Sequence, residues 1–303
     1  MYLEHFKLNE PPFSLTPNTN FYCDLPTHQE TLNALLSGLQ QGDGFIKIIG
    51  KMGTGKTLLC LLLLHKLSDD FVTVYIPNSD PNGHGLHELL AHDLGLSVEK
   101  NLPQDLSSDM ITQRLLELHK AGKKTVLIID ESHALSDDCL ETVQLLTSLE
   151  TEGKKVLQVV LCGQPELDKR LKKHALRQLK QRITLSCRLK LLNKNELNLY
   201  LCHRLAKAGY TCGMIFSASA KKRLFRASGG LPRLLNVLCH KALLVSYGRG
   251  INQVDTKSMR RAIADTESIL RTRHLNCANA ILVLTTTVCI ALIMVVYRKA
   301  GLF

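Results

Sequence analysis

One stretch of the sequence has the spacing of glycine, lysine and threonine that is typical of phosphate binding. Residues 50–57 read Gly-Lys-Met-Gly-Thr-Gly-Lys-Thr, the G-x-x-x-x-G-K-T pattern of a P-loop. Glycines let backbone N–H groups turn toward phosphates, and the start of a helix adds a favourable dipole. We expect Lys56 to reach the β- and γ-phosphates and the Thr57 hydroxyl to bind Mg²⁺. The residues expected around the nucleotide are Gly50, Lys51, Met52, Gly53, Thr54, Gly55, Lys56, Thr57 and Leu58.

An acidic pair, Asp130-Glu131, directly follows the apolar run Thr125 to Ile129. The carboxyl end of a buried strand beside a P-loop is where the magnesium ion needs a second protein ligand, so we expect Asp130 to join Thr57 in binding Mg²⁺. The next carboxylate, Glu131, can orient and deprotonate an attacking water. An Asp-Glu pair, in place of the Lys/Asn-x-x-Asp pattern of GTPases, favours ATP over GTP.

Three arginines are candidates for contact with a γ-phosphate. Such an arginine assists phosphoryl transfer and is often supplied by a neighbouring subunit. Arg177 and Arg182 lie in Leu-Arg-Gln-Leu-Lys-Gln-Arg, just before a predicted fifth strand, and Arg233 ends Gly-Gly-Leu-Pro-Arg at the start of a helix. The alternative for each is a solvated surface position, and the sequence leaves the choice between Arg177 and Arg182 open.

The pattern of apolar runs predicts the elements that must position these residues. Strand-like runs alternate with helical patterns up to Leu189, which predicts an α/β fold whose parallel sheet of five strands is covered by helices on both faces. The predicted strands are 45–49, 71–76, 125–129, 156–162 and 183–189. The predicted helices between and before them are 27–39, 57–67, 85–94, 109–121 and 139–150.

After Leu189 only helical patterns follow, over 194–208, 217–227, 231–247 and 256–271, with Asn193 and Asp255 as expected N-caps. We therefore predict a small all-helical lid domain. The predicted divisions are 1–40 (N-terminal segment of the ATPase module), 41–190 (α/β nucleotide-binding domain), 191–270 (lid), 271–277 (juxtamembrane linker), 278–297 (transmembrane helix) and 298–303 (short tail).

The segment Ala278 to Tyr297 contains no charged residue and is bracketed by basic ones. Twenty helical residues extend over roughly 30 Å, the thickness of the hydrocarbon core of a bilayer. We expect a single transmembrane helix, and the alternative is a buried C-terminal helix. Charges at Glu4 and Lys7 interrupt any apolar core near the start, so no signal peptide is expected. Because the nucleotide site needs ATP, the ATPase domain that precedes the predicted membrane helix is expected in the cytoplasm.

Net charge and cysteine content indicate what kind of partner and which cellular compartment to expect for this protein. The formal charge of +11 suggests an anionic partner. Ten scattered cysteines without a CxxC spacing suggest small reduced core residues and exclude a secreted disulfide scaffold. Basic residues crowd two regions: Lys169, Arg170, Lys172, Lys173, Lys180 and Lys190, and then Lys221, Lys222, Arg223 and Arg226. The alternatives for these residues are solvated helix faces with subunit-interface charges, a surface for anionic lipid, and a nucleic-acid surface, against which the lack of an accompanying recognition motif argues.

These motifs occur in an order that resembles the AAA+ ATPases of the ExeA/GspA type, from about Leu3 to Ala264. The P-loop, the acidic pair, Gly-Gln-Pro-Glu-Leu at 163–167, the arginine segment and Gly-Leu-Pro-Arg carry the resemblance. Within this group the chain is most similar to the MshM type, which serves mannose-sensitive haemagglutinin (type IV) pilus biogenesis. The resemblance implies an ATP hydrolase that assembles as a homo-oligomer, for example a hexameric ring, at the bacterial inner membrane with pilus or secretion assembly proteins.

The resemblance also implies residue roles. Gln164 stands where such proteins place the sensor-1 polar residue, although the usual type there is Asn or Thr. Arg182 matches the arginine-finger region, with Arg177 as the alternative, and Arg233 matches sensor 2, which contacts the nucleotide. Asn78 matches the switch residue that restrains Glu131. Longer relatives place a peptidoglycan-binding domain beyond the membrane helix, so we expect a separate partner to supply any such binding here.

Two other functions share the same core motifs. The first is a DNA-associated AAA+ helper ATPase of the transposition or loader kind, which predicts salt-sensitive binding to duplex DNA. The second is a nucleotide-binding scaffold that does not hydrolyse ATP. The apolar segment 278–297 argues against the first, and an intact Glu131 argues against the second.

Overall fold

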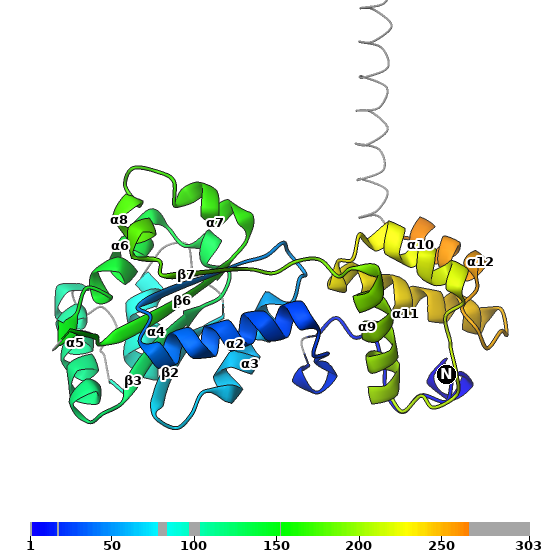
Figure 1. The fold of residues 1–303 in the computed structure, drawn as a ribbon, viewed down its shortest axis with the longest axis horizontal. Coiled ribbons are helices and arrows are strands. Elements are labelled where there is room, and N and C mark those ends of the chain that lie inside the picture. The colour runs from blue at the N-terminus through cyan, green and yellow to red at the C-terminus, as the bar shows by residue number, and fades with distance from the viewer. Residues whose placement is uncertain (1, 17, 78–83, 97–103, 152, 267–303) are drawn as a thin grey trace, which may run out of the picture. The chain divides into compact units, whose positions relative to one another are not determined.

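The computed structural model describes residues 2–16, 18–77, 84–96, 104–151 and 153–266 (Figure 1). Asn78 and the predicted transmembrane segment 278–297 lie outside these residues. Within the described ranges, no helix combines the length and the apolar character that crossing a bilayer requires.

The chain divides by its internal contacts into two units. The first, here called the sheet unit, comprises residues 14–208 and 231–233, and the second, the helical unit, takes the rest. Helix α9 (Lys194–Lys207) is counted with the sheet unit. Its Glu196 accepts a hydrogen bond from Thr27, and the guanidinium of its Arg204 lies 4.8 Å from the ring centre of Phe21.

The sheet unit is built on a five-stranded sheet whose strands all pair in parallel, which confirms the predicted α/β architecture. The order across the sheet is β2-β3-β6-β1-β7. The strands are β1 (Phe45–Ile49), β2 (Phe71–Ile76), β3 (Lys124–Ile129), β6 (Leu157–Gly163) and β7 (Leu185–Arg188). Because β1, β3 and β6 are neighbours, the loops that follow them meet at one edge, where ligands of such sheets bind.

Helices cover both faces of this sheet, because side chains alternate along each strand. Ile46 and Ile48 of β1 pack with α2 (Pro26–Gln41) and α3 (Lys56–Lys66), which lie together on one side in Figure 1. Phe45 and Ile49 point into the opposite core. The helices that contribute to that second core are α4 (His84–Asp93), α5 (Gln104–Lys120), α6 (Asp137–Leu146), α7 (Pro165–Arg170) and α8 (Arg177–Arg182).

The elements differ from the sequence-based expectation in several places. Helix α6 ends at Leu146, not at Glu150, because Glu150–Thr151 (β4) turns back as a hairpin against Lys154–Lys155 (β5). Helix α5 begins at Gln104, five residues earlier than predicted. Helices α7 and α8 were not predicted, since six residues are too few to show a helical period. Cys202 and Cys212 are exposed, contrary to the prediction of core cysteines.

The helical unit contains α1 (Tyr2–His5), α10 (Ala218–Ser228), α12 (Thr256–Ala264) and most of α11 (Pro232–Gly248). The predicted N-cap at Asp255 is confirmed, because its carboxylate accepts the backbone N–H of Ser258. In the sheet unit, the N-cap predicted at Asn193 is confirmed too and forms a capping box with Glu196.

Candidate functional site

The P-loop connects β1 to α3 and needs glycine at defined positions. The N–H of Gly50 donates to the backbone oxygen of Gly163 at 3.1 Å, which ties the loop to the end of β6. A Cβ at Gly50 would come within 2.6 Å of Oγ1 of Thr54, whose hydroxyl donates to the oxygen of Lys51. Gly53 and Gly55 have φ of +81° and +98°, a region that other L-residues rarely adopt. The loop is therefore shaped by its own backbone, as a phosphate cradle must be.

The other P-loop residues differ in their solvent exposure. Lys51 and Met52 are exposed, whereas Thr54 is buried and Leu58 is partly buried against the core under α3. The exposed pair precedes the left-handed glycines, whereas Thr54 lies between them and Leu58 follows them. The buried residues anchor the loop to the sheet unit.

Lys56 begins α3 and is the buried cation of the site, with 4% of its surface exposed. Its Nζ lies 3.5 Å from the backbone oxygen of Lys51 and 3.8 Å from Oε1 of Glu131. Removing an ammonium group from water is costly unless an anion compensates it. The long distance to Glu131 leaves the ammonium available for a stronger anionic partner, which fits a phosphate in the P-loop.

Thr57 and Asp130 form the closest polar contact of the site. The Thr57 hydroxyl donates to Oδ2 of Asp130 at 2.5 Å, and the N–H of Glu131 donates to Oδ1 at 2.8 Å. Burial raises the pKa of Asp130, while these two hydrogen bonds oppose the rise. A hydroxyl and a carboxylate are hard oxygen donors of the kind that Mg²⁺ prefers. The pair therefore fits a magnesium ion, with Thr57 and Asp130 as its protein ligands.

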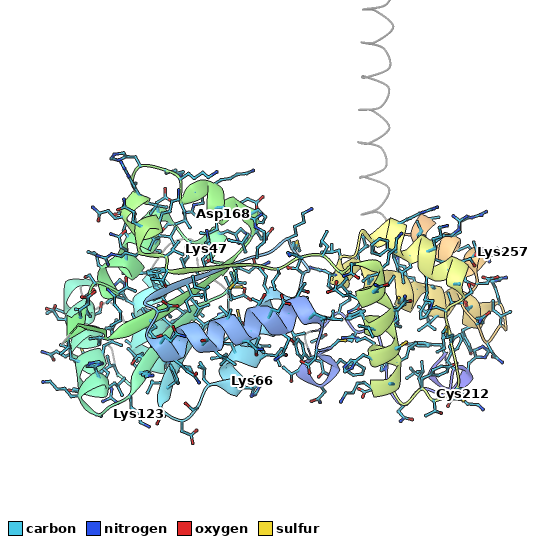
Figure 2. All side chains as sticks on the ribbon, viewed as in Figure 1. Lys47, Lys66, Lys123, Asp168, Cys212 and Lys257 are labelled. Atoms are coloured by element: carbon cyan, nitrogen blue, oxygen red, sulfur yellow. The ribbon has the colours of Figure 1, made fainter. Side chains whose placement is uncertain are left out.

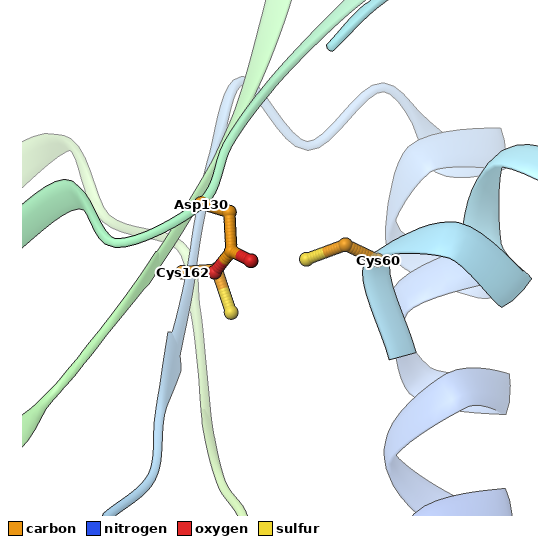
Figure 3. Close-up of side chains that lie close together, drawn as sticks. All are labelled: Cys60, Asp130 and Cys162. Atoms are coloured by element: carbon orange, nitrogen blue, oxygen red, sulfur yellow. The ribbon is translucent and has the colours of Figure 1, made fainter. Parts of the chain in front are cut away.

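Two thiols lie on the core side of Asp130. Figure 3 shows the sulfur atoms of Cys60, from α3, and Cys162, from β6, close to its carboxylate, and these ligand atoms lie within 4.8 Å of one another. The hydrogen bond between the thiols and their burial raise the pKa of Cys162 well above its usual range. Neutral thiols are soft, poor ligands for Mg²⁺. The magnesium ion is therefore expected on the Thr57 side of Asp130.

Glu131 has a strained backbone and a crowded carboxylate. Its φ of 49° and ψ of 33° place it in the left-handed region, and its side chain is 32% exposed. The amide nitrogen of Gln164, the N-cap residue of α7, lies 3.4 Å from Oε2, and Nδ1 of His133 lies 3.2 Å from the same oxygen. The structure thus brings Gln164, predicted to follow the fourth strand, to the carboxylate predicted to act as base.

Arg233 lies directly on the P-loop. Its backbone N–H donates to the oxygen of Gly53 at 3.2 Å, and a Cβ at Gly53 would come within 2.7 Å of the Cβ of Arg233. Gly53 therefore excludes larger residues both by its φ and by this contact. The guanidinium end belongs to an exposed residue at the start of α11.

The remaining two arginines lie on α8, beside α6. Arg182 donates from Nη1 to the backbone oxygen of Gln144 at 2.8 Å, and Arg177 is exposed on the first turn of the same helix. Gln178, between them, also accepts a hydrogen bond from the Gln144 side chain. Their place on α8 does not distinguish which arginine would reach a nucleotide.

Part of the basic surface has a structural role that the sequence did not indicate. Arg170 forms an ion pair with Asp137 and also donates to the backbone oxygen of His133 at 2.8 Å. Lys173 pairs with the other carboxylate oxygen of Asp137 at 3.1 Å. These two cations fix the start of α6 and are less available for lipid or nucleic acid than a free surface would be.

Two histidines of the site were missed. His28 on α2 is buried, and its Nε2 lies 3.2 Å from the backbone oxygen of Thr54, so it braces the P-loop from outside. No local pattern connects residue 28 with residue 54. His133 contacts Glu131 and Gln164, and its position two residues after Glu131 was a signal that the sequence did contain.

Known proteins resemble this chain in sequence and in fold. Residues 39–171 match the family model of an AAA domain. The chain is also 40% identical over 254 residues to "General secretion pathway protein A" of Aeromonas hydrophila, a match over 84% of this chain. It covers 46% of that protein, so it spans about half the length of this curated relative.

Solved structures share the fold at low identity. The ORC2 protein of Aeropyrum pernix, determined as ADPNP-ADP complexes, matches with a TM-score of 0.62 and 16% identity over 82% of this chain and 72% of that one. The ORC1 protein of the same organism, determined in complex with DNA, matches with a TM-score of 0.62 and 16% identity over 86% of this chain and 70% of that one. The chain therefore has the α/β P-loop AAA+ fold of these structures.

Proposed function

We propose that this protein is an AAA+ ATP hydrolase. The contact between Thr57 and Asp130, with Glu131 next in the chain and Lys56 before it, carries the proposal, because it unites the expected phosphate, metal and water-activating groups at one edge of the sheet. In this site Lys56 binds the phosphates and Glu131 accepts the proton of the attacking water. Mg²⁺, held by Thr57 and Asp130, neutralises charge on the phosphates when it is bound.

Steady-state ATP hydrolysis by the full chain tests this function. Lys56→Ala and Glu131→Gln should each lower kcat by about a hundredfold or more, since each removes a group that acts in the transition state. Lys66→Ala is the matched control, because it removes an exposed lysine from the last turn of the same helix. Equal turnover in all variants would exclude hydrolysis at this site, and wild-type ATP binding without hydrolysis would support the scaffold alternative.

The protein works as a homo-oligomer in which Arg177 or Arg182 completes the site of a neighbouring subunit. The place of both arginines on α8, beside α6, supports this division of labour, and the AAA domain is consistent with it. Mixing Lys56→Ala with Arg182→Ala subunits tests the idea, with Arg177→Ala in a parallel series. If the finger acts between subunits, two inactive variants should regain part of the activity when mixed; mixtures as inactive as their components contradict it.

The activity serves the assembly of envelope machinery at the bacterial inner membrane. The similarity to general secretion pathway protein A supports a role in secretion or secretin assembly, and the resemblance to the MshM type supports a type IV (MSHA) pilus client. The segment 278–297 anchors the protein by a single pass, with the AAA domain in the cytoplasm. Glu131→Gln holds bound ATP, so crosslinking this variant in membranes should capture pilus or secretion proteins; recovery in the soluble fraction contradicts the anchor.

A second candidate is a DNA-associated helper ATPase. Exposed Lys222 and Arg226 on α10, together with Lys257 and Arg260 on α12, favour it, because they gather positive charge in the helical unit. Duplex binding whose logarithmic affinity falls linearly with the logarithm of salt concentration would support this function. Unchanged binding in Lys222→Glu and Arg226→Glu would exclude this surface.

A further inference from the structure

Three side chains meet around one oxygen of the proposed base. Oε2 of Glu131 lies 3.2 Å from Nδ1 of His133 and 3.4 Å from the amide nitrogen of Gln164. The same amide nitrogen lies 3.0 Å from Nε2 of His133. The imidazole therefore contacts Glu131 with one nitrogen and Gln164 with the other.

The partners of His133 decide which nitrogen carries its proton. An ionised carboxylate only accepts hydrogen bonds, so the Gln164 group that faces Glu131 is its NH₂, which only donates. That NH₂ also faces Nε2 of His133, which must therefore accept. In the neutral imidazole the proton then lies on Nδ1, the nitrogen nearest to Glu131. The contact has ion-pair distance but not hydrogen-bond alignment, so the carboxylate must rotate slightly to accept this proton.

Tertiary contacts hold the turn that carries His133. The turn is a short 3₁₀ helix, η2 (Ser132–Ala134), and the Ser132 hydroxyl donates to the backbone oxygen of Cys162 on β6. Arg170, at the end of α7, donates to the backbone oxygen of His133 at 2.8 Å. Gln164 precedes the same helix α7, so both ends of α7 fix the position of the imidazole.

The backbone of Glu131 provides an independent sign of constraint. Among the described residues other than glycine, only Lys7 and Glu131 have a positive φ. A non-glycine residue in this region costs about 1–2 kcal/mol and persists when its surroundings over-determine it. The strained conformation places the Glu131 side chain where Lys56, His133 and Gln164 surround it.

We propose that His133 is a positioning residue that holds the Glu131 carboxylate through Nδ1 during ATP hydrolysis. The role rests on the proposed function, since it requires Glu131 to act as the base. In the arrangement described, Lys56 also approaches Glu131, at 3.8 Å from Oε1. A phosphate in the P-loop attracts Lys56 away from this oxygen, and His133 with Gln164 then keeps the carboxylate in place on the Oε2 side.

Substitutions that imitate one ring nitrogen at a time test the role. An asparagine amide can take the place of Nδ1, and a glutamine amide can take the place of Nε2. With the full chain and Mg-ATP, His133→Ala and His133→Gln should lower kcat by about tenfold or more, because misplacing a catalytic group is costly. His133→Asn should retain most of kcat. The KM for ATP should stay close to wild type in all three, since the described contacts of His133 are with Glu131, Gln164 and Arg170 and not with the P-loop.

Controls separate this role from general damage. His65→Ala removes an exposed histidine from the last turn of α3 and should leave both constants unchanged. If the wild-type protein hydrolyses ATP and His133→Ala has the same kcat, the role of His133 is overturned while the proposed function stands. Equal losses in the Asn and Ala variants, or a rise in KM that matches the fall in kcat, overturn it in favour of a structural role. An inactive wild type overturns the proposed function, and the inference with it.

Discussion

The hydroxyl of Thr57 and the carboxylate of Asp130, 73 positions apart in the chain, are joined by a hydrogen bond of 2.5 Å. The bond links the first turn of α3 to the end of β3, and it places two hard oxygen ligands side by side. The hydrogen bond therefore brings the P-loop and the acidic pair together at one edge of the sheet.

Replacement of Thr57 tests whether this pair serves a metal ion. Thr57→Ala should lower Mg-dependent ATP hydrolysis by about a hundredfold, because a metal ligand and its oxygen are lost. Thr57→Ser keeps the hydroxyl and should remain within about tenfold of wild type. Thr142→Ala, at a partly exposed position on α6 away from the P-loop, is the control. A Ser variant as inactive as the Ala variant would show that the hydroxyl is not the group that matters.

His28 should influence nucleotide affinity although it belongs to α2. Its Nε2 lies 3.2 Å from the oxygen of Thr54 inside the P-loop. His28→Ala removes this donor and should raise the Kd for ATP about fivefold, because one hydrogen bond contributes roughly 1 kcal/mol. His28→Gln can place an amide N–H at the same position and should recover part of the affinity. Calorimetric titration with ATP measures both; an unchanged Kd in the Ala variant contradicts the bracing role.

The ion pair between Lys47 of β1 and Asp168 of α7 should stabilise the sheet unit. Nζ of Lys47 lies 2.5 Å from Oδ1 of Asp168, and the two labelled residues lie close together in Figure 2. The Lys47 side chain is only 13% exposed. Asp168→Ala leaves the Lys47 ammonium without this partner and should lower the free energy of unfolding by about 3 kcal/mol.

A second substitution separates the pair from its parts. Lys47→Met removes the charge and fills a similar volume, so Lys47→Met with Asp168→Ala should be more stable than Asp168→Ala alone. Denaturant unfolding of the four variants in the cycle measures the coupling. Strictly additive losses would mean that the ion pair contributes nothing, and Asp168 would then act through Arg188, which binds its other oxygen at 2.8 Å.

Asp255 should make the helical unit sensitive to acid. The hydrogen bond from Arg249 lowers the pKa of this carboxyl, and the backbone N–H of Ser258 lowers it further. Because the folded pKa is depressed, the stabilising effect is present above the ordinary aspartate pKa of about 3.9 and is lost as the pH falls toward the folded pKa. The side chain is 40% exposed, so solvent screens the ion pair and the effect is small.

Acid unfolding followed by circular dichroism tests this behaviour. The wild-type protein should lose stability below about pH 4. Asp255→Asn should be less stable at neutral pH, and its free energy of unfolding should fall less as the pH is lowered. Asp265→Asn, whose exposed carboxylate pairs with Lys241 beyond the end of α12, is the comparison. The same loss of unfolding free energy with falling pH in wild type and in Asp255→Asn would contradict the role of Asp255.

The strands and most helices could be predicted because their signals are local. Strands β1, β3 and β6 are largely buried, mainly apolar runs, and β1 and β2 match their predicted bounds. Helices α7 and α8 and the β4-β5 hairpin were not predicted, because each is too short to repeat a period and forms where the surrounding core accepts it. The same limit explains why the predicted end of α6 was too late.

The sequence by itself determined the P-loop, the acidic pair and the alternation of elements that produces a parallel sheet, since residue type and spacing carry these features along the chain. Only the tertiary structure decided what surrounds them. It placed His28 behind Thr54, two thiols behind Asp130, and His133 with Gln164 against Glu131. Such contacts join residues from different strands and helices, and they depend on strand order and packing, which spacing in one sequence does not encode.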